Sequence, residues 1–173
     1  AFTTLPSVDS LRVIRAFPPL RGEGPRVAFR GYGAPVLGGE RPGVQVADAG
    51  GSFFRGSLAD VEAVRDLAPL PQTGPELKRL AGVLGAADDD VRLGADATET
   101  AVKQADLASA DVLAFATHGL LSGDLKGLAE PALVLTPPEF ATPTDDGLLT
   151  ASEVAELKLS ADWVILSACN TAG

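Results

Sequence analysis

The residues of this sequence best suited to acid–base and nucleophilic chemistry are a histidine and a cysteine. His118 and Cys169 are the only residues of their kinds in the 173-residue chain. A thiol is mostly protonated at neutral pH, and a nearby imidazole can remove its proton or stabilise the thiolate. The imidazole can later return that proton to a leaving amine. The two residue types together predict thiol-based nucleophilic catalysis.

Each of these residues directly follows an apolar run that is typical of a buried strand. Residues 111–117 (DVLAFAT) lead into His118, and residues 163–168 (WVILSA) lead into Cys169. In parallel α/β sheets, sites form beyond the carboxyl ends of the strands. If the two strands are parallel neighbours, both side chains lie at the same edge. The backbone N–H groups of Gly119 and Cys169 are then candidate oxyanion donors.

Spacing alone leaves other interpretations of the two residues open. A single cysteine after an apolar strand is often a small buried hydrophobic residue, and a single histidine at a strand end is often only hydrogen-bonded there. A metal site is not favoured, because one histidine and one cysteine leave too few ligands for zinc. One cysteine also excludes an internal disulfide.

The elements that must position His118 and Cys169 alternate between helices and strands. Besides the two apolar runs, strands are predicted within residues 26–37, at 91–93 and at 133–135. Helices are predicted over residues 9–16, over 73–84 with Thr73 as N-cap and Gly85 as stop, from Thr98 to near Leu107, and after a capping box at Thr150. This alternation predicts a mostly parallel sheet covered by helices on both faces.

Three further features are interpreted as structural. Asp145-Asp146-Gly147 is predicted to form a solvated turn, because Asp-Gly is common turn chemistry. Residues 88–90, all aspartate, are predicted to be a charged loop, and Trp163 is predicted to be a core residue.

Composition limits the classes of protein that this chain can belong to. Its length suits one domain, and its net charge of −9 comes from 23 acidic and 14 basic residues. That balance disfavours nucleic acid as a partner, since phosphate binding requires clustered Lys and Arg. The sequence contains no apolar run of membrane-spanning length and no export signal. With the free thiol and the residue usage, this predicts a bacterial cytoplasmic protein without membrane contact.

The segments around both reactive residues resemble the CHAT family of caspase-like cysteine peptidases, relatives of caspases and separases. The resemblance is carried by LAFATHGLLSG, EPALVL and DDGLLTASEVAELKLSADWVILSACNTAG, and it extends back through LPQTGPELKRLAGVLGA and, more weakly, GYGAPVL. The best-matching region is residues 69–173. Residues 1–173 are therefore expected to form a partial CHAT domain, truncated after the nucleophile strand, with the remainder beyond residue 173.

The resemblance implies a fold, an activity and partners. It implies a caspase-like three-layer α/β sandwich, with the general base at His118 in ATHG and the nucleophile at Cys169 in SACNT. The implied activity is hydrolysis of peptide bonds in a protein substrate through a thioacyl-enzyme, without a cofactor. The implied partners are a protein or peptide substrate, a C-terminal half or small subunit, and the tetratricopeptide-type helical repeats to which members are commonly joined in bacterial proteolysis and defence.

Two other functions belong to different classes. The main alternative is a catalytically silent caspase-like scaffold in a signalling or defence protein. A small-molecule-binding flavodoxin-like domain is disfavoured, because no glycine-rich phosphate loop separates the first strand from a helix.

Overall fold

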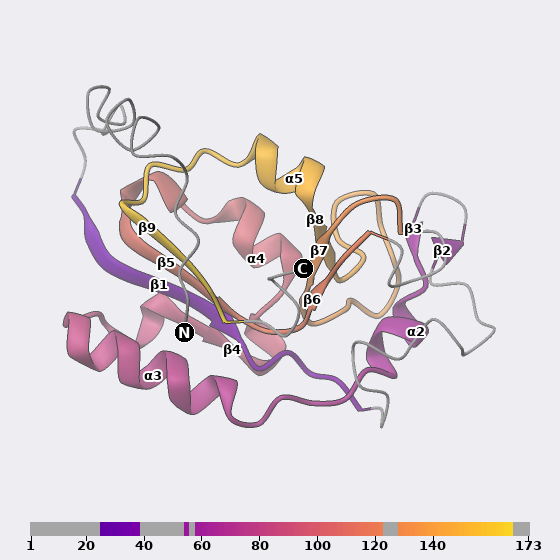
Figure 1. The fold of residues 1–173 in the computed structure, drawn as a ribbon, viewed down its shortest axis with the longest axis horizontal. Coiled ribbons are helices and arrows are strands. Elements are labelled where there is room, and N and C mark those ends of the chain that lie inside the picture. Colours follow the sequence, from indigo (N-terminus) through magenta and orange to yellow (C-terminus); the bar gives the residue numbers. More distant parts are fainter. Residues whose placement is uncertain (1–24, 39–53, 56–57, 123–127, 168–173) are drawn as a thin grey trace.

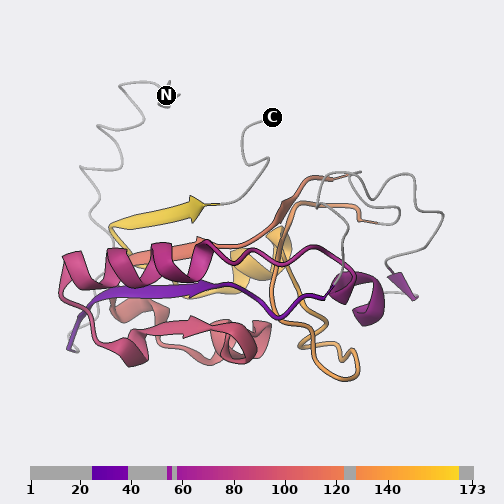
Figure 2. The same cartoon turned by 90° about the horizontal axis from the view of Figure 1, so that it is seen from below.

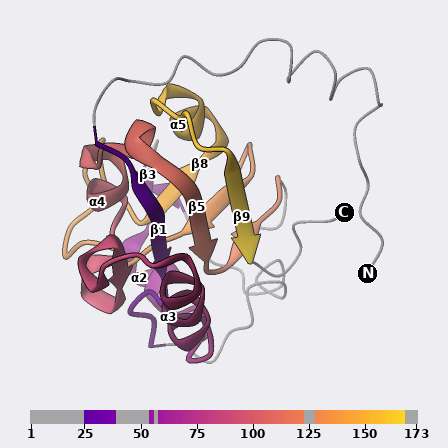
Figure 3. The same ribbon diagram turned by 90° about the vertical axis from the view of Figure 1, so that its left-hand side faces the viewer.

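A parallel sheet forms the centre of the computed structural model, which describes residues 25–38, 54–55, 58–122 and 128–167. Its strand order is β4-β1-β5-β9, where these strands are β1 (Val27–Gly33), β4 (Val91–Leu93), β5 (Ala110–Ala116) and β9 (Trp163–Ser167). In Figure 3, β1, β5 and β9 lie side by side and run in the same direction. The expected α/β fold with a mostly parallel sheet is confirmed, whereas the helix predicted at residues 9–16 lies outside the described residues.

Helices cover both faces of this sheet, as the alternation in the sequence predicts. Figure 1 shows α3 (Thr73–Leu84) on one side of the strands, and α4 (Glu99–Gln104) and α5 (Ala151–Glu156) on the other. Successive β5 side chains point to opposite faces. Ala114 and Ala116 therefore pack with Leu77 of α3, while Leu113 and Phe115 pack in the cluster that contains α4 and α5.

The helix boundaries largely follow the capping signals. Gly85 ends α3 in the left-handed conformation, with a φ of 71°. Thr98 caps α4 by accepting a hydrogen bond from the Ala101 N–H, although α4 ends at Gln104, before the predicted Leu107. Thr150 and Glu153 form the predicted capping box of α5.

The prediction that Thr73 caps α3 is wrong. The N-cap residue is Gln72, whose side chain makes no capping bond, and Thr73 is the first helical residue. The Thr73 hydroxyl instead donates to the Leu70 carbonyl at 2.8 Å and accepts from the Ala34 N–H at 3.1 Å. The hydroxyl has a tertiary partner just beyond β1, so it joins the start of α3 to the sheet.

Two small antiparallel sheets lie beyond the carboxyl ends of the central strands (Figure 2). One contains β6 (Gly119–Leu120), β7 (Ala132–Val134) and β8 (Leu148–Thr150), and the other contains β2 (Phe54–Arg55) and β3 (Leu58–Ala59), followed by α2 (Val61–Arg65). The strand predicted at 133–135 thus exists one residue earlier, in a small sheet. A separate apolar cluster joins this region, including Leu37, Val64, Leu67, Leu120, Val134 and Leu148.

The predictions that β9 is a buried strand and that Trp163 is a core residue are wrong for the described part of the chain. Trp163 is 71% exposed, Val164 50% and Leu166 47%. Among the described strands β9 pairs only with β5, so it is an edge strand and both of its faces carry exposed apolar side chains.

Gly33, at the end of β1, lies in close contact with both β5 and α3. A Cβ added at this residue would stand 2.5 Å from the Ala116 carbonyl oxygen and 2.7 Å from Leu77 Cδ1. The first of these neighbours is backbone, which cannot rotate away as a side chain can. The absence of a side chain at Gly33 therefore lets the ends of β1 and β5 approach closely beneath α3.

We predict that Gly33→Ala lowers the free energy of unfolding by about 1–3 kcal/mol, the usual cost of overpacking a core. Gly82→Ala is the matched control, because Gly82 lies inside α3 with open space around its Cα. Alanine there should be neutral or stabilise by up to about 1 kcal/mol through helix propensity. Denaturant unfolding of the two variants measures the difference; equal effects would contradict the close approach at Gly33.

Candidate functional site

His118 is held at the carboxyl end of β5 by its own backbone. Its carbonyl accepts a hydrogen bond of 2.9 Å from the Val134 N–H, and the neighbouring Thr117 hydroxyl donates to the Val134 carbonyl. The chain thus passes directly from β5 into the small sheet, with no free loop between them. His118 is only 5% exposed, so its side chain is packed as well as anchored.

The imidazole of His118 is hydrogen-bonded to the backbone carbonyl of Ala68. The distance from Nε2 to the Ala68 oxygen is 2.8 Å. A carbonyl oxygen can only accept, so Nε2 must carry the hydrogen and donate it. In the neutral ring this leaves Nδ1 unprotonated, and Nδ1 is the nitrogen that can take a proton from another group.

The N–H of Gly119 points away from the neighbouring strand. Gly119 is paired with Leu133 in the antiparallel β6–β7 ladder, while the His118 carbonyl accepts from Val134. Hydrogen-bonding positions alternate along an antiparallel pair, so a residue one position beyond a bonded one turns its N–H outward. The Gly119 N–H is therefore outside the β6–β7 ladder, as an oxyanion donor must be.

The register between β5 and β9 relates the two halves of the predicted dyad. The strands are parallel, and Ala116 is paired with Ser167. His118 follows Ala116 by two positions, and Cys169 follows Ser167 by two positions in the sequence. Cys169 itself, the predicted nucleophile and second oxyanion donor, lies outside the described residues.

An apolar cavity of about 410 Å³ lies beside Gly119. Its walls come from β5, the small sheet, α5 and one face of β9, and include Leu113, Phe115, Leu120, Val154, Val164 and Leu166. Nearly all of its lining is aliphatic or aromatic, so it offers no charged group to a ligand. Its inner wall is the same face of β5 that packs against α4 and α5.

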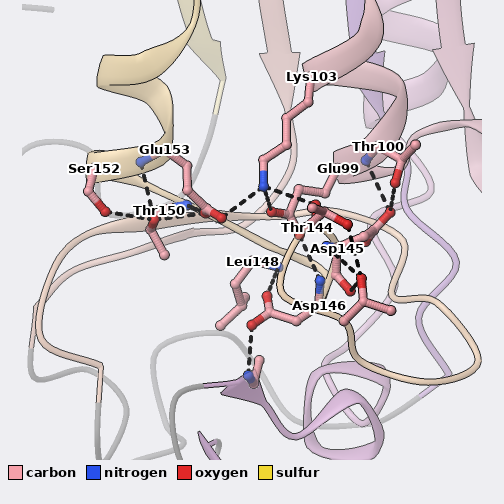
Figure 4. Close-up of polar contacts among 12 residues, drawn as sticks. Glu99, Thr100, Lys103, Thr144, Asp145, Asp146, Leu148, Thr150, Ser152 and Glu153 are labelled. Carbon is pink, nitrogen blue, oxygen red and sulfur yellow. Dashed lines mark hydrogen bonds and ion pairs between the residues drawn. The ribbon is translucent and has the colours of Figure 1, made fainter.

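A buried polar network on the α4 side of the molecule was not anticipated from the sequence (Figure 4). Glu99 is 1% exposed, and its Oε2 accepts from the N–H groups of Asp146 and Gly147 at 2.8 and 3.2 Å. Its Oε1 accepts from Lys103 Nζ at 2.5 Å, and Lys103 also donates to Glu153 at 2.8 Å. These contacts tie α4 to the turn at residues 145–147 and to α5.

The turn predicted at residues 145–147 was expected to be exposed to solvent, and this part of the prediction is wrong. Asp145 is 8% exposed, and its Oδ2 accepts from both the N–H and the hydroxyl of Thr100, at 3.0 and 2.6 Å. Asp146 accepts from the Ala59 N–H at 2.7 Å and the Leu148 N–H at 3.1 Å. The carboxylates satisfy backbone donors that would otherwise be buried without partners. The turn itself is confirmed, because Gly147 has a φ of 88°.

The pKa values in this network follow from burial and from the shared lysine. Burial raises the pKa of Glu99 to about 7, even though Lys103 and the backbone donors oppose the shift. Burial likewise raises the pKa of Asp146. For Glu153 the effect of burial is outweighed by hydrogen bonds from Lys103 and Thr150, which lower its pKa. Burial alone would lower the pKa of Lys103, but its bonds to Glu153 and Glu99 raise it.

The other residues that drew attention in the sequence have structural roles where they are described. Residues Asp88–Asp90 form a short 3-10 turn, in which Asp90 accepts from the Ala87 N–H. The described residues contain no group of three or more His, Cys, Asp or Glu side chains that could hold a metal ion. None of the helices in the described ranges has the length and apolar character needed to cross a bilayer.

Comparison with known families identifies the chain. The family model of the CHAT domain matches residues 1–173, and the chain belongs to this family. The match confirms the resemblance carried by the sequence motifs, and the parallel sheet flanked by helices agrees with the caspase-like sandwich of the family. No curated protein and no solved structure matches the chain significantly.

We predict that Glu99 makes stability pH-dependent near neutrality. Because its pKa is raised in the fold, the folded state binds the extra proton, so Glu99 supports stability most at low pH and loses this contribution as pH rises toward 7. Between about pH 5.5 and 8 the loss should be on the order of 2 kcal/mol. Glu99→Gln removes this dependence, so the stability of the variant relative to the wild type should rise with pH.

Denaturant unfolding at several pH values measures this effect. Glu62→Gln is the matched control, because the Glu62 side chain is 70% exposed and, within the described ranges, is paired with Arg65. The difference between this control and the wild type should stay nearly constant over the same range. An equal pH slope in Glu99→Gln and the wild type would contradict a titrating Glu99.

Proposed function

We propose that this chain carries the catalytic dyad of a cysteine endopeptidase, with His118 as general base and Cys169 as nucleophile. The observation that supports the proposal most directly is the parallel register of β5 and β9. It pairs Ala116 with Ser167, the residues that precede His118 and Cys169 by two positions. Two neighbouring parallel strands that end at the same level place the residues that follow them at the same edge of the sheet. Membership of the CHAT family supports the same assignment.

The contacts of His118 suit it to the role of the base. The Ala68 carbonyl holds Nε2–H, so Nδ1 is the atom that removes the proton from the Cys169 thiol. The thiolate then attacks the carbonyl carbon of the scissile peptide bond, and the carbonyl electrons move to the oxygen. The positive charge that His118 gains is stabilised by the Ala68 carbonyl, which accepts a stronger hydrogen bond from a charged ring.

Gly119 stabilises the tetrahedral intermediate. Its N–H lies outside the β6–β7 ladder and donates to the oxyanion, and the Cys169 N–H is the second donor. Collapse of the intermediate breaks the C–N bond, and the departing amine takes the proton from His118. A water molecule then gives a proton to His118 and attacks the thioester, which releases the acid and restores the thiol. No cofactor enters this sequence of steps.

We assign the reaction to internal peptide bonds of a protein substrate, within a larger bacterial protein in which a second half of the domain completes the pocket and helical-repeat regions are joined to it. The competing function is a silent scaffold with the same fold. The two functions differ in one measurable property, the coupling between His118 and the thiol, because a scaffold does not need an activated cysteine.

We predict that iodoacetamide alkylates Cys169 rapidly at pH 6–7 and that His118→Ala slows this reaction on the order of 10- to 100-fold. The expected reason is that the thiol of the variant returns toward its ordinary pKa and is then mostly protonated. Because the chain has one cysteine, intact mass measured against time reports Cys169 alone.

Lys78→Ala, on the exposed face of α3, is the control and should alkylate like the wild type. Circular dichroism of both variants verifies that they fold. The dyad would be overturned, and the scaffold supported, if the wild type alkylated slowly at pH 6–7 and its rate rose only as an ordinary thiol titrates. The rate would then also be the same in His118→Ala.

A further inference from the structure

A second cavity lies on the same face of the central sheet as the apolar one but toward the β4 edge, between α4 and the strands β1 and β4. Its volume is about 500 Å³, and its lining is mainly polar, including Arg30, Tyr32, Arg92, Thr98 and Gln104. It shares no lining residue with the apolar cavity beside Gly119. The proposed peptidase mechanism makes no use of any of its residues.

The sheet itself brings the two arginines together. Arg30 and Tyr32 are two positions apart in β1, so their side chains lie on the same face. Tyr32 is paired with Arg92 in the parallel β1–β4 ladder, and paired residues of neighbouring strands also share a face. Two guanidinium groups and a phenol therefore meet on one face of the sheet, at the wall of the cavity.

Arg30 has an unused donor within the part of the chain that the structure describes. Its Nε is buried and makes no hydrogen bond to any of those residues. Asp90 places a carboxylate oxygen 3.9 Å from Nη1 of Arg30, and Asp90 also accepts from the Ala87 N–H. A buried donor without an acceptor is costly, and a ligand oxygen in the cavity would remove that cost.

Two positive charges act on the phenol of Tyr32 at the inner wall. Burial raises the pKa of Tyr32, the guanidinium groups of Arg30 and Arg92 oppose that shift, and the Asp90 carboxylate adds to it. Both guanidinium groups are therefore close enough to the same oxygen to influence it. Two carboxylates, those of Asp96 and Asp106, also line the cavity; like Arg92 they are exposed, so water screens their charges, whereas Arg30 is half-buried.

We propose that this cavity binds the phosphate group of a small phosphorylated molecule. Two guanidinium forks and a phenol O–H match a dianion with three terminal oxygens better than they match a carboxylate, which has one charge and two oxygens. The cavity is much larger than a phosphate, so the organic part of the ligand also lies within it. Thr98 and Gln104 supply further polar contacts for that part.

Isothermal titration calorimetry with inorganic phosphate, glycerol 3-phosphate and succinate tests the proposal. Both phosphates should bind, glycerol 3-phosphate more tightly because it also fills the adjoining space, and succinate should bind weakly or not at all. Arg30→Gln and Arg92→Gln should each weaken phosphate binding about tenfold or more, as expected for the loss of a hydrogen bond from a charged donor. Tyr32→Phe should weaken it less.

Arg79→Gln is the matched control, because it removes the same charge from an exposed position on α3, across the sheet. It should bind phosphate like the wild type. Arg92 is exposed, so Arg92→Gln remains a fair test even if Arg30→Gln disturbs folding. Absence of phosphate binding, tighter binding of succinate, or equal weakening in Arg79→Gln would overturn the proposal. His118→Ala should bind phosphate like the wild type, so phosphate binding can be tested independently of the proposed peptidase activity.

Discussion

The parallel hydrogen-bonded ladder through β5 is the constraint on which the other parts of the structure depend. β5 pairs with β1 on one side and with β9 on the other, and alternate side chains serve the two helical layers. The register of this ladder sets the level in the sheet at which each strand ends, and so it sets where the chain leaves β5 and enters β6. The position of His118 therefore depends on the backbone hydrogen bonds along the whole length of β5.

The surroundings of His118 contrast with those of the acidic network. The imidazole is oriented by a neutral backbone carbonyl, whereas Glu99 and Glu153 are both ion-paired with Lys103 on the α4 side. The contact that orients the ring is thus a hydrogen bond to a backbone oxygen and not an ion pair. Carboxylates in this protein instead satisfy buried N–H groups, which is a structural task.

Much of the fold could be predicted from the sequence, because its signals are local. The apolar run before His118 predicts β5. Helix ends are marked by short-range hydrogen bonds at Thr98 and Thr150 and by the backbone conformation of Gly85. Tertiary contacts were not predictable. Thr73 bonds to Ala34 across the fold, and Glu99 looks like an ordinary acid in a first helical turn. The Ala68 carbonyl carries no sequence signal, since every residue has one, although Pro69 disfavours helix there.

The burial of Glu99 also bears on the order in which the molecule assembles. Its backbone partners, the N–H groups of Asp146 and Gly147, come almost fifty residues later in the chain. If α4 docked on the sheet alone, Lys103 of the same helix could still bind Oε1 of Glu99, but Oε2 would enter the interior without its two backbone donors. Docking of α4 is therefore favoured by the arrival of the distant turn, which couples the two segments through the closure of a long loop.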